Sequence, residues 1–206
     1  MKNINTKALI LKSVSIGFVL CFLFSMLDFD AKSNNISDSI LRLHILANSD
    51  SAEDQNLKLA VRDEVSKYCS SLFDDVSEKS QAEKIISQHM NEIVEIARKE
   101  VYNKGYDYDV KGELVNMYFT NRTYENITLP AGFYDAVRIT VGSGNGHNWW
   151  CVMFPPICVG ACDKIGELSD VLDPDEVNMV SDNKYCCKFK IYEVYQNFVN
   201  KIDKEE

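Results

Sequence analysis

The sequence predicts an α+β domain in which a mostly antiparallel sheet packs against two or three helices, preceded by an N-terminal signal or anchor helix. The first observation is the order of local patterns, which runs strand, two helices, three or four strands, then a closing strand and helix. Helices grouped beside a run of strands are typical of α+β domains, whereas regular strand–helix alternation indicates a parallel sheet. The second observation is that residues 1–27 carry lysines but no acidic group, unlike the acidic remainder of the chain.

The N-terminus has the pattern of an export signal, which we predict over residues 1–31. Lysines precede an uncharged apolar stretch from Val14 to Leu27, and this order of charged and apolar regions is found in secretory signals. The stretch is shorter than the roughly 20 residues of most spanning helices. Residues 8–27 together are long enough to anchor the chain if Lys12 extends to the membrane interface. The lysines are expected to stay inside while the rest crosses the membrane.

The cleavage signal is poor, because Phe29 stands where the motif before Lys32 favours a small residue. A cleaved secretory signal and a retained signal anchor therefore remain alternatives. Residues 32–39 are predicted to form a short polar linker. Residues 40–206 are predicted to form a single extracytoplasmic domain that meets the membrane only through the N-terminal segment.

Charge and cysteine content narrow the class of protein. The net charge of −9 argues against nucleic acid as a partner and against adhesion to anionic lipid. The six cysteines after the apolar segment permit up to three disulfides in an exported domain. Cys151 and Cys158 are disulfide candidates, since they flank the bend at Pro155–Pro156. Cys186 and Cys187 are expected to point to different sides of a strand.

The first strand and helix have the clearest local patterns. Residues 40–47 alternate as a strand, with Leu41, Leu43 and Ile45 on one face and Arg42 and His44 on the other. The polar cluster that follows supplies helix caps, and negative charge in the first turn favours a helix that extends to about residue 72. The buried stripe of this helix is predicted at Leu57, Val61, Val65 and Cys69. A second row, of alternating charges, is predicted at Asp54, Lys58 and Arg62.

The remaining elements follow from changes of period. A helix is predicted over residues 83–102 and ends before Gly105. Strands are predicted over residues 106–119, 134–141, 149–154 and 185–191. Residues 163–183 are predicted to hold one short helix and a turn at Pro174, and a closing helix is predicted over residues 192–202. The glycine-rich stretch 142–148 is expected to be a flexible hairpin tip that pairs the strands on either side of it.

Two catalytic or metal-binding interpretations compete with structural ones. His44 beside Asp50 has the composition of an acid–base pair, but Ser49 and Asp50 are better explained as caps of the following helix. Cys158 and Cys162 have a spacing compatible with zinc, but the sequence offers no second ligand pair of similar spacing. We therefore predict no catalytic residue, no metal and no cofactor, and keep an exported cell-wall hydrolase using His44 and a carboxylate as the alternative.

Four segments, in this order, resemble those of the stage II sporulation protein R family of endospore-forming bacteria. They are Arg42–Ser51, residues 54–58 with 61–63, Thr128–Gly132, and Asn148–Pro156. The N-terminal apolar segment is also similar. The resemblance covers residues 10–162, while residues 163–206 match less clearly.

The resemblance implies a signalling role rather than catalysis. Such a protein is made in the forespore and secreted across the forespore membrane into the intermembrane space. There it activates a membrane-embedded aspartic protease of the mother cell, which cleaves the precursor of sigma-E. On this basis we expect a receptor-facing surface at the polar junction after the first strand, or at the paired tryptophans. The predicted partner-binding residues are Arg42, His44, Asn48, Asp50, Asp54, Arg62, Trp149 and Trp150.

Overall fold

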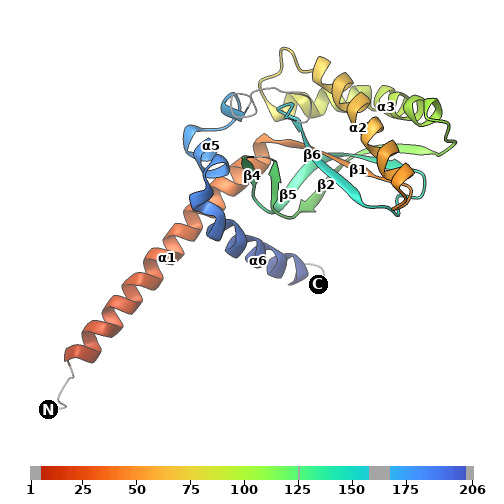
Figure 1. Ribbon diagram of the computed structural model, residues 1–206. Coiled ribbons are helices and arrows are strands. Elements are labelled where there is room, and N and C mark those ends of the chain that lie inside the picture. Colours follow the sequence, from red (N-terminus) through yellow and green to blue (C-terminus); the bar gives the residue numbers. More distant parts are fainter. Residues whose placement is uncertain (1–5, 125, 158–167, 203–206) are drawn as a thin grey trace.

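The computed structural model describes residues 6–124, 126–157 and 168–202, and confirms the predicted α+β class (Figure 1). A long N-terminal helix, α1 (Thr6–Ser39), projects from one side of a domain built on a four-stranded sheet. The sheet is mostly antiparallel, with one parallel pair, and its strand order is β2-β5-β1-β6. Its two faces are covered by different elements, so the domain has two separate hydrophobic cores.

The centre of the sheet is β1 (Leu41–Leu46). It pairs in parallel with β5 (Gly132–Val141) and antiparallel with β6 (Asn148–Phe154), while β2 (Val110–Phe119) pairs antiparallel with β5. The predicted hairpin between the β5 and β6 segments is therefore wrong. Both strands flank β1, and their connection crosses the end of β1. Neighbouring strands lie about 4.8 Å apart, so a six-residue connection easily spans the extra strand.

Two antiparallel helices cover one face of the sheet (Figure 1). They are α2 (Ala52–Ser71) and α3 (Lys79–Asn103), which confirms both predicted helices. The polar cluster caps α2 as predicted, but the cap is Ser51, whose Oγ accepts the amide hydrogen of Asp54 at 3.1 Å, and not Ser49 or Asp50. Inward residues of β1 and the predicted stripe of α2 meet in this core: Leu41, Leu43, Ile45, Leu57, Val61, Val65 and Cys69.

The other face is covered by elements far apart in the sequence. These are the end of α1, α5 (Pro174–Ser181), α6 (Cys186–Ile202) and a small hairpin that the sequence did not predict, β3 (Arg122–Tyr124) with β4 (Ile127–Leu129). The predicted turn at Pro174 is instead the start of α5, where Asp173 forms a capping box and Pro174 occupies the first turn. The second core buries apolar side chains of all these elements.

Residues 32–39, predicted as a polar linker, are the last part of α1. Ile36 is fully buried, and Phe29 lies edge-on to Phe189 and Tyr192 of α6 at centroid distances of 5.2 and 5.3 Å. Ser33 donates to the carbonyl of Phe29 at 2.8 Å, so this polar side chain is satisfied within the helix. The sequence prediction failed because the apolar residues are sparse and the partners of Phe29 lie 160 or more positions away in α6.

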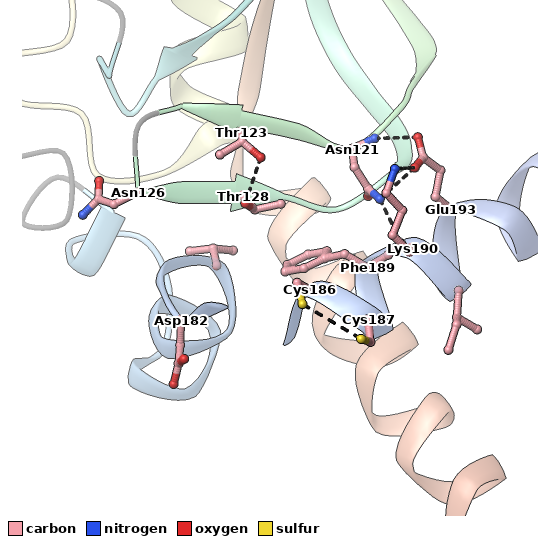
Figure 2. A pocket seen from close by; sticks show the side chains of 12 residues that line it. Asn121, Thr123, Asn126, Thr128, Asp182, Cys186, Cys187, Phe189, Lys190 and Glu193 are labelled. Atoms are coloured by element: carbon pink, nitrogen blue, oxygen red, sulfur yellow. Dashed lines mark hydrogen bonds and ion pairs between the residues drawn. The ribbon is translucent and has the colours of Figure 1, made fainter. Parts of the chain in front are cut away.

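The strand predicted over residues 185–191 is also wrong, since α6 begins at Cys186 after a short 3-10 turn. Cys186 and Cys187 both lie exposed in its first turn rather than on opposite faces of a strand. Figure 2 shows how α6 is held: Asn121 donates to Glu193 at 3.1 Å and to the carbonyl of Phe189 at 2.9 Å. These polar contacts join residues far apart in the sequence. The apparent strand alternation over residues 185–191 is a local pattern and therefore gave no sign of them.

Cys151 is disulfide-bonded. Cys158, its predicted partner, lies outside the described residues.

Candidate recognition site

The predicted site residues separate into three buried residues, Arg42, His44 and Asp54, and a group that is partly or fully exposed. Arg42 and His44 are 0% and 3% exposed, so their predicted place on a recognition surface is wrong. They point away from α2 and α3, as predicted, but this second face of the sheet is covered by the second core. A strand pattern shows which residues share a face, but it does not show whether another layer covers that face.

Arg42 is enclosed by aromatic rings. Its guanidinium carbon lies 4.1 Å from the ring centroid of Phe119, 4.9 Å from that of Tyr134 and 5.8 Å from that of Tyr124. Nη2 donates to the hydroxyl of Tyr124 and Nε to the carbonyl of Cys151, while Nη1 has no hydrogen-bond partner among the described residues. Cation–π attraction and two hydrogen bonds thus offset part of the cost of burying the charge. Arg42 is a structural residue that joins β1 to β3 and β5.

His44 stacks face to face on Trp150, with ring centroids 3.9 Å apart. Burial, and to a lesser degree the positive charge of Arg138, lower the pKa of His44 to about 4. His44 is therefore neutral at neutral pH and is not paired with Asp50. The hydrolase alternative is not supported, because its proposed acid–base residue is buried away from the polar junction.

The buried imidazole predicts a pH-dependent stability. Folded His44 has a pKa of about 4, whereas an unfolded histidine titrates near 6.5. The stabilisation is present above about pH 6.5 and is lost as the pH falls toward about 4, because the unfolded state binds the proton more tightly. Urea unfolding of the full chain in detergent should show a midpoint that falls between pH 7 and pH 5. His44→Phe keeps a ring on Trp150 and should flatten this dependence; an unchanged dependence would refute the assignment.

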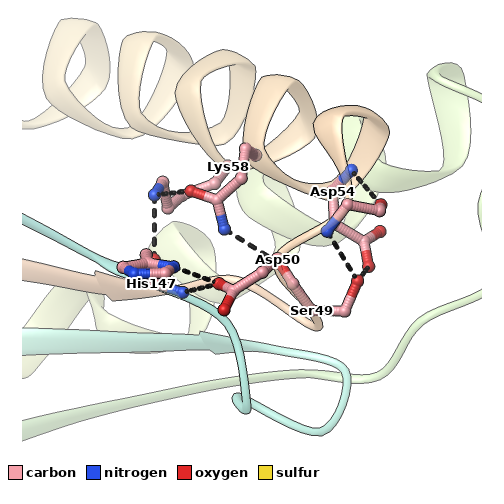
Figure 3. Close-up of polar contacts among 7 residues, drawn as sticks. Ser49, Asp50, Asp54, Lys58 and His147 are labelled. Atoms are coloured by element: carbon pink, nitrogen blue, oxygen red, sulfur yellow. Dashed lines mark hydrogen bonds and ion pairs between the residues drawn. The ribbon is translucent and has the colours of Figure 1, made fainter.

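The polar junction between β1 and α2 forms a closed hydrogen-bond network (Figure 3). Asp54 is buried and accepts from Asn48 Nδ2 at 2.9 Å and from Ser49 Oγ at 2.5 Å. Burial raises the pKa of the Asp54 carboxyl, but hydrogen bonds from Ser49, Asn48 and Tyr108 outweigh it and lower the pKa overall. Asp54 therefore stays ionised and fixes the shape of the turn. Its predicted pairing with Lys58 is not found, since Lys58 donates to Gln55 and to the carbonyl of His147.

The glycine-rich connection docks on this junction, which corrects its interpretation as a flexible tip. Asn48 accepts from the amide of Ser143 at 3.0 Å, and the amide of Gly146 donates to the carbonyl of Ala47 at 2.9 Å. Gly142 has a φ of +61°, and a Cβ there would lie 2.3 Å from Asn48 Oδ1. The glycines thus permit close backbone approach rather than freedom of motion.

Gly146→Ala is expected to lower the free energy of unfolding by about 1–3 kcal/mol. Its added Cβ would lie 2.2 Å from the backbone oxygen of Ser49, so the connection or the α2 cap must shift. Urea unfolding of the full chain in detergent measures the change. Asn145→Ala is the matched control, because the Asn145 side chain is exposed and its backbone amide, which donates to the carbonyl of Asn48 at 3.3 Å, is kept. Equal stability of the two variants would contradict the docked arrangement.

Asp50 pairs with His147, a residue that the sequence patterns did not single out. The Asp50 carboxylate accepts the backbone amide of His147 at 2.6 Å and contacts its Nδ1, and both side chains are exposed. The hydrogen bonds from His147 lower the pKa of Asp50. The sequence signal for His147 was its place at the end of the glycine-rich connection, but the pairing depends on where that connection crosses β1.

The two surfaces predicted as alternatives are brought together by one strand. Trp149 and Trp150 lie in β6, which begins one residue after His147, and pair with Ile45 and His44 of β1. Both tryptophans are half-buried: Arg62 of α2 lies over the Trp149 ring, 4.6 Å from its centroid, and Trp150 covers His44. The surface residues of this site are Asn48, Asp50, Arg62, His147 and Trp149, which we call the junction surface.

The arrangement suits binding. Its polar groups are held by the backbone of two elements and a docked connection, and its aromatic and arginine side chains are of the kind that dominate binding energy at protein interfaces. Among residues 6–124, 126–157 and 168–202, no group of three or more histidine, cysteine or acidic side chains could hold a metal ion. The zinc interpretation of Cys158 and Cys162 lies outside the described residues.

The fold and this site define an α+β domain, carried on an apolar N-terminal helix, with a preformed polar and aromatic surface. The sequence model of the family described as Stage II sporulation protein R (spore_II_R) matches residues 37–164, and the chain belongs to this family. It is 40% identical over 123 residues to a protein of Bacillus subtilis (strain 168) named Stage II sporulation protein R. That match covers 60% of this chain and 55% of the relative. No solved structure matches the chain. Membership of this family supports a sporulation-related role.

Proposed function

We propose that this chain is an exported sporulation signal, made in the forespore, that activates the mother-cell membrane aspartic protease which cleaves pro-sigma-E. The observation that carries the proposal is the family match over residues 37–164, which includes every residue of the junction surface. The exposed apolar part of α1 supports export, because by length and composition it can cross a membrane or serve as a signal sequence. In this role the protein acts as a ligand and has no catalytic step of its own.

We further propose that α1 is retained as an anchor rather than cleaved. Cleavage after Ala31 would separate Phe29 and Asp30 from the domain. Phe29 is 1% exposed against α6, and Asp30 accepts a hydrogen bond from the Tyr192 hydroxyl at 2.9 Å. Cleavage would therefore open the second core. The domain would sit in the intermembrane space, close to the membrane from which α1 emerges.

Activation would proceed by population shift. The junction surface binds the active state of the protease more tightly than the inactive state, so binding raises the active fraction. Rigidity favours this, since a preorganised surface loses little conformational entropy on binding. Asp50 contributes a fixed negative charge, because its hydrogen bonds to His147 keep its pKa below the ordinary value. Arg62 and Trp149 supply a neighbouring cation and aromatic face.

The test is reconstitution in a non-sporulating bacterial host. The full chain, the candidate protease and pro-sigma-E are produced together, and precursor cleavage is scored. Cleavage should require both the chain and the active-site aspartate of the protease. Cleavage that is the same without the chain, or that persists with an inactive protease, would overturn the proposal. Fractionation of the same cells at high salt reports on α1: a retained anchor keeps the chain with membranes, whereas a cleaved chain becomes soluble.

A further inference from the structure

The last helix, α6, has an exposed apolar face that nothing within the described residues covers. Ile191, Val194, Tyr195 and Phe198 recur at helical spacing and are 44–70% exposed. The opposite face is buried in the second core through Phe189 and Tyr192. A helix that is apolar on both faces is unusual at a water-exposed surface and indicates a second apolar environment.

The direction of this exposed face is fixed by the contacts of the buried one. Asn121, which follows β2, holds Glu193 and the carbonyl of Phe189, and its Oδ1 accepts the amide of Ala131 at 2.6 Å (Figure 2). Phe29 and Asp30 of α1 hold Phe189 and Tyr192. Because these contacts lie on the side of the sheet and of α1, the exposed apolar face points away from the sheet.

The position of α6 along α1 identifies the second environment. The exposed apolar residues of α1 end at Leu27, and Phe29, two positions later, already contacts α6. In Figure 1, α6 leaves α1 beside this point and runs across its axis. A bilayer that contains the apolar part of α1 would therefore end next to α6, and α6 would lie along its surface.

The composition of α6 fits a membrane interface. Its exposed face presents Tyr195 and Phe198. Tyrosine is enriched at the level of lipid head groups, and phenylalanine is common on the apolar face of helices that lie in the interface. The helix carries Lys188, Lys190 and Lys201, whereas its one acidic residue, Glu193, faces Asn121. This local positive charge is opposite in sign to the net charge of the chain and complements anionic head groups.

We propose that α6 is a membrane-surface helix that rests its exposed apolar face on the same bilayer that α1 enters. The sequence predicted membrane contact only through the N-terminal segment, and the inference adds a second contact from the other end of the chain. The two contacts together would fix the tilt of the domain, and hence the direction in which the junction surface points. The inference depends on retention of α1 and not on protease activation.

Quenching of an introduced tryptophan by lipid tests this placement. The full chain carrying Phe198→Trp is reconstituted into vesicles of phosphatidylcholine and phosphatidylglycerol whose acyl chains are brominated near the head group. Vesicle flotation first confirms that α1 is inserted, so a failure of anchoring is seen separately. The unmodified chain gives the background of Trp149 and Trp150. The matched control is Tyr102→Trp, a similarly exposed aromatic position at the C-terminal end of α3, whose core lies on the opposite face of the sheet from α6.

The proposal expects the added fluorescence of Phe198→Trp to shift to shorter wavelength and to be quenched by the brominated lipid, while that of Tyr102→Trp is unchanged. Equal quenching at the two positions in floated vesicles would overturn it. A blue shift that depends on protein density, without quenching, would assign the face to a second copy of the chain and also overturn it. A shift that appears only after the protease is added would assign the face to that protein, with the same consequence.

Discussion

Replacement of Arg42 by alanine is expected to lower the free energy of unfolding by about 2–4 kcal/mol, and to abolish signalling only by reducing the amount of folded protein. The substitution leaves a cavity among Phe119, Tyr124 and Tyr134 and removes three cation–π contacts. It also leaves the Tyr124 hydroxyl without its Arg42 donor. The substitution also removes a buried charge and with it the cost of keeping that charge away from water. This gain limits the expected loss in the free energy of unfolding to about 4 kcal/mol.

Arg42→Met separates shape from charge at this position. Methionine fills most of the space without a charge, so this variant should recover much of the stability that alanine loses. Urea unfolding of the full chain in detergent measures the three proteins. If Arg42→Ala keeps wild-type stability yet fails to activate the protease, Arg42 makes a direct contact with its partner and the structural assignment is wrong.

Replacement of Phe29 by alanine is expected to cost about 3–5 kcal/mol, a large effect for a position inside the predicted export signal. Phe29 is 1% exposed and meets Phe189 and Tyr192 edge-on, so alanine opens a cavity between α1 and α6. A residue of a signal peptide or flexible linker would tolerate the change. Unfolding by urea and limited proteolysis of α6, both on the full chain in detergent, report the loss.

Phe24→Ala is the control for the Phe29 experiment, because Phe24 lies in the same helix but is exposed in the apolar part. It should leave the stability of the domain unchanged. Equal effects at the two positions would show that the end of α1 is not part of the domain, and would remove the main support for a retained anchor.

Local sequence patterns correctly predicted the elements that cover one face of the sheet, which are the helices α2 and α3. The repeat of Leu57, Val61, Val65 and Cys69 and the alternation of β1 were confirmed because each depends only on residues close in sequence. The burial of Arg42 and His44 could not be predicted in this way. It depends on α1, α6 and the β3–β4 hairpin, which reach the second face of the sheet from both ends of the chain.

The candidate site was predicted in part for the same reason. The polar cluster was correctly predicted to cap α2, although the cap is Ser51 rather than Ser49 or Asp50. Asn48, Asp50, Arg62 and Trp149 are at least partly exposed, so a partner can reach them. The assumed hairpin hid the pairing of His147 with Asp50, since it placed β6 beside β5 rather than beside β1. The correct strand order brings the polar junction and the tryptophans to one edge of the molecule.

The junction surface is tested most directly by charge reversal at Asp50, measured as cleavage of pro-sigma-E in the co-expression system. Asp50 is exposed, and Asp50→Lys puts a cation where the proposed interface has a carboxylate. Asp75→Lys, at an exposed aspartate in the α2–α3 connection, makes the same charge change elsewhere. At equal amounts of folded, membrane-bound protein, we expect Asp50→Lys to lose about tenfold or more in cleavage, a change of about 1.4 kcal/mol in binding, and Asp75→Lys to match the wild type. Wild-type cleavage by Asp50→Lys would contradict the account.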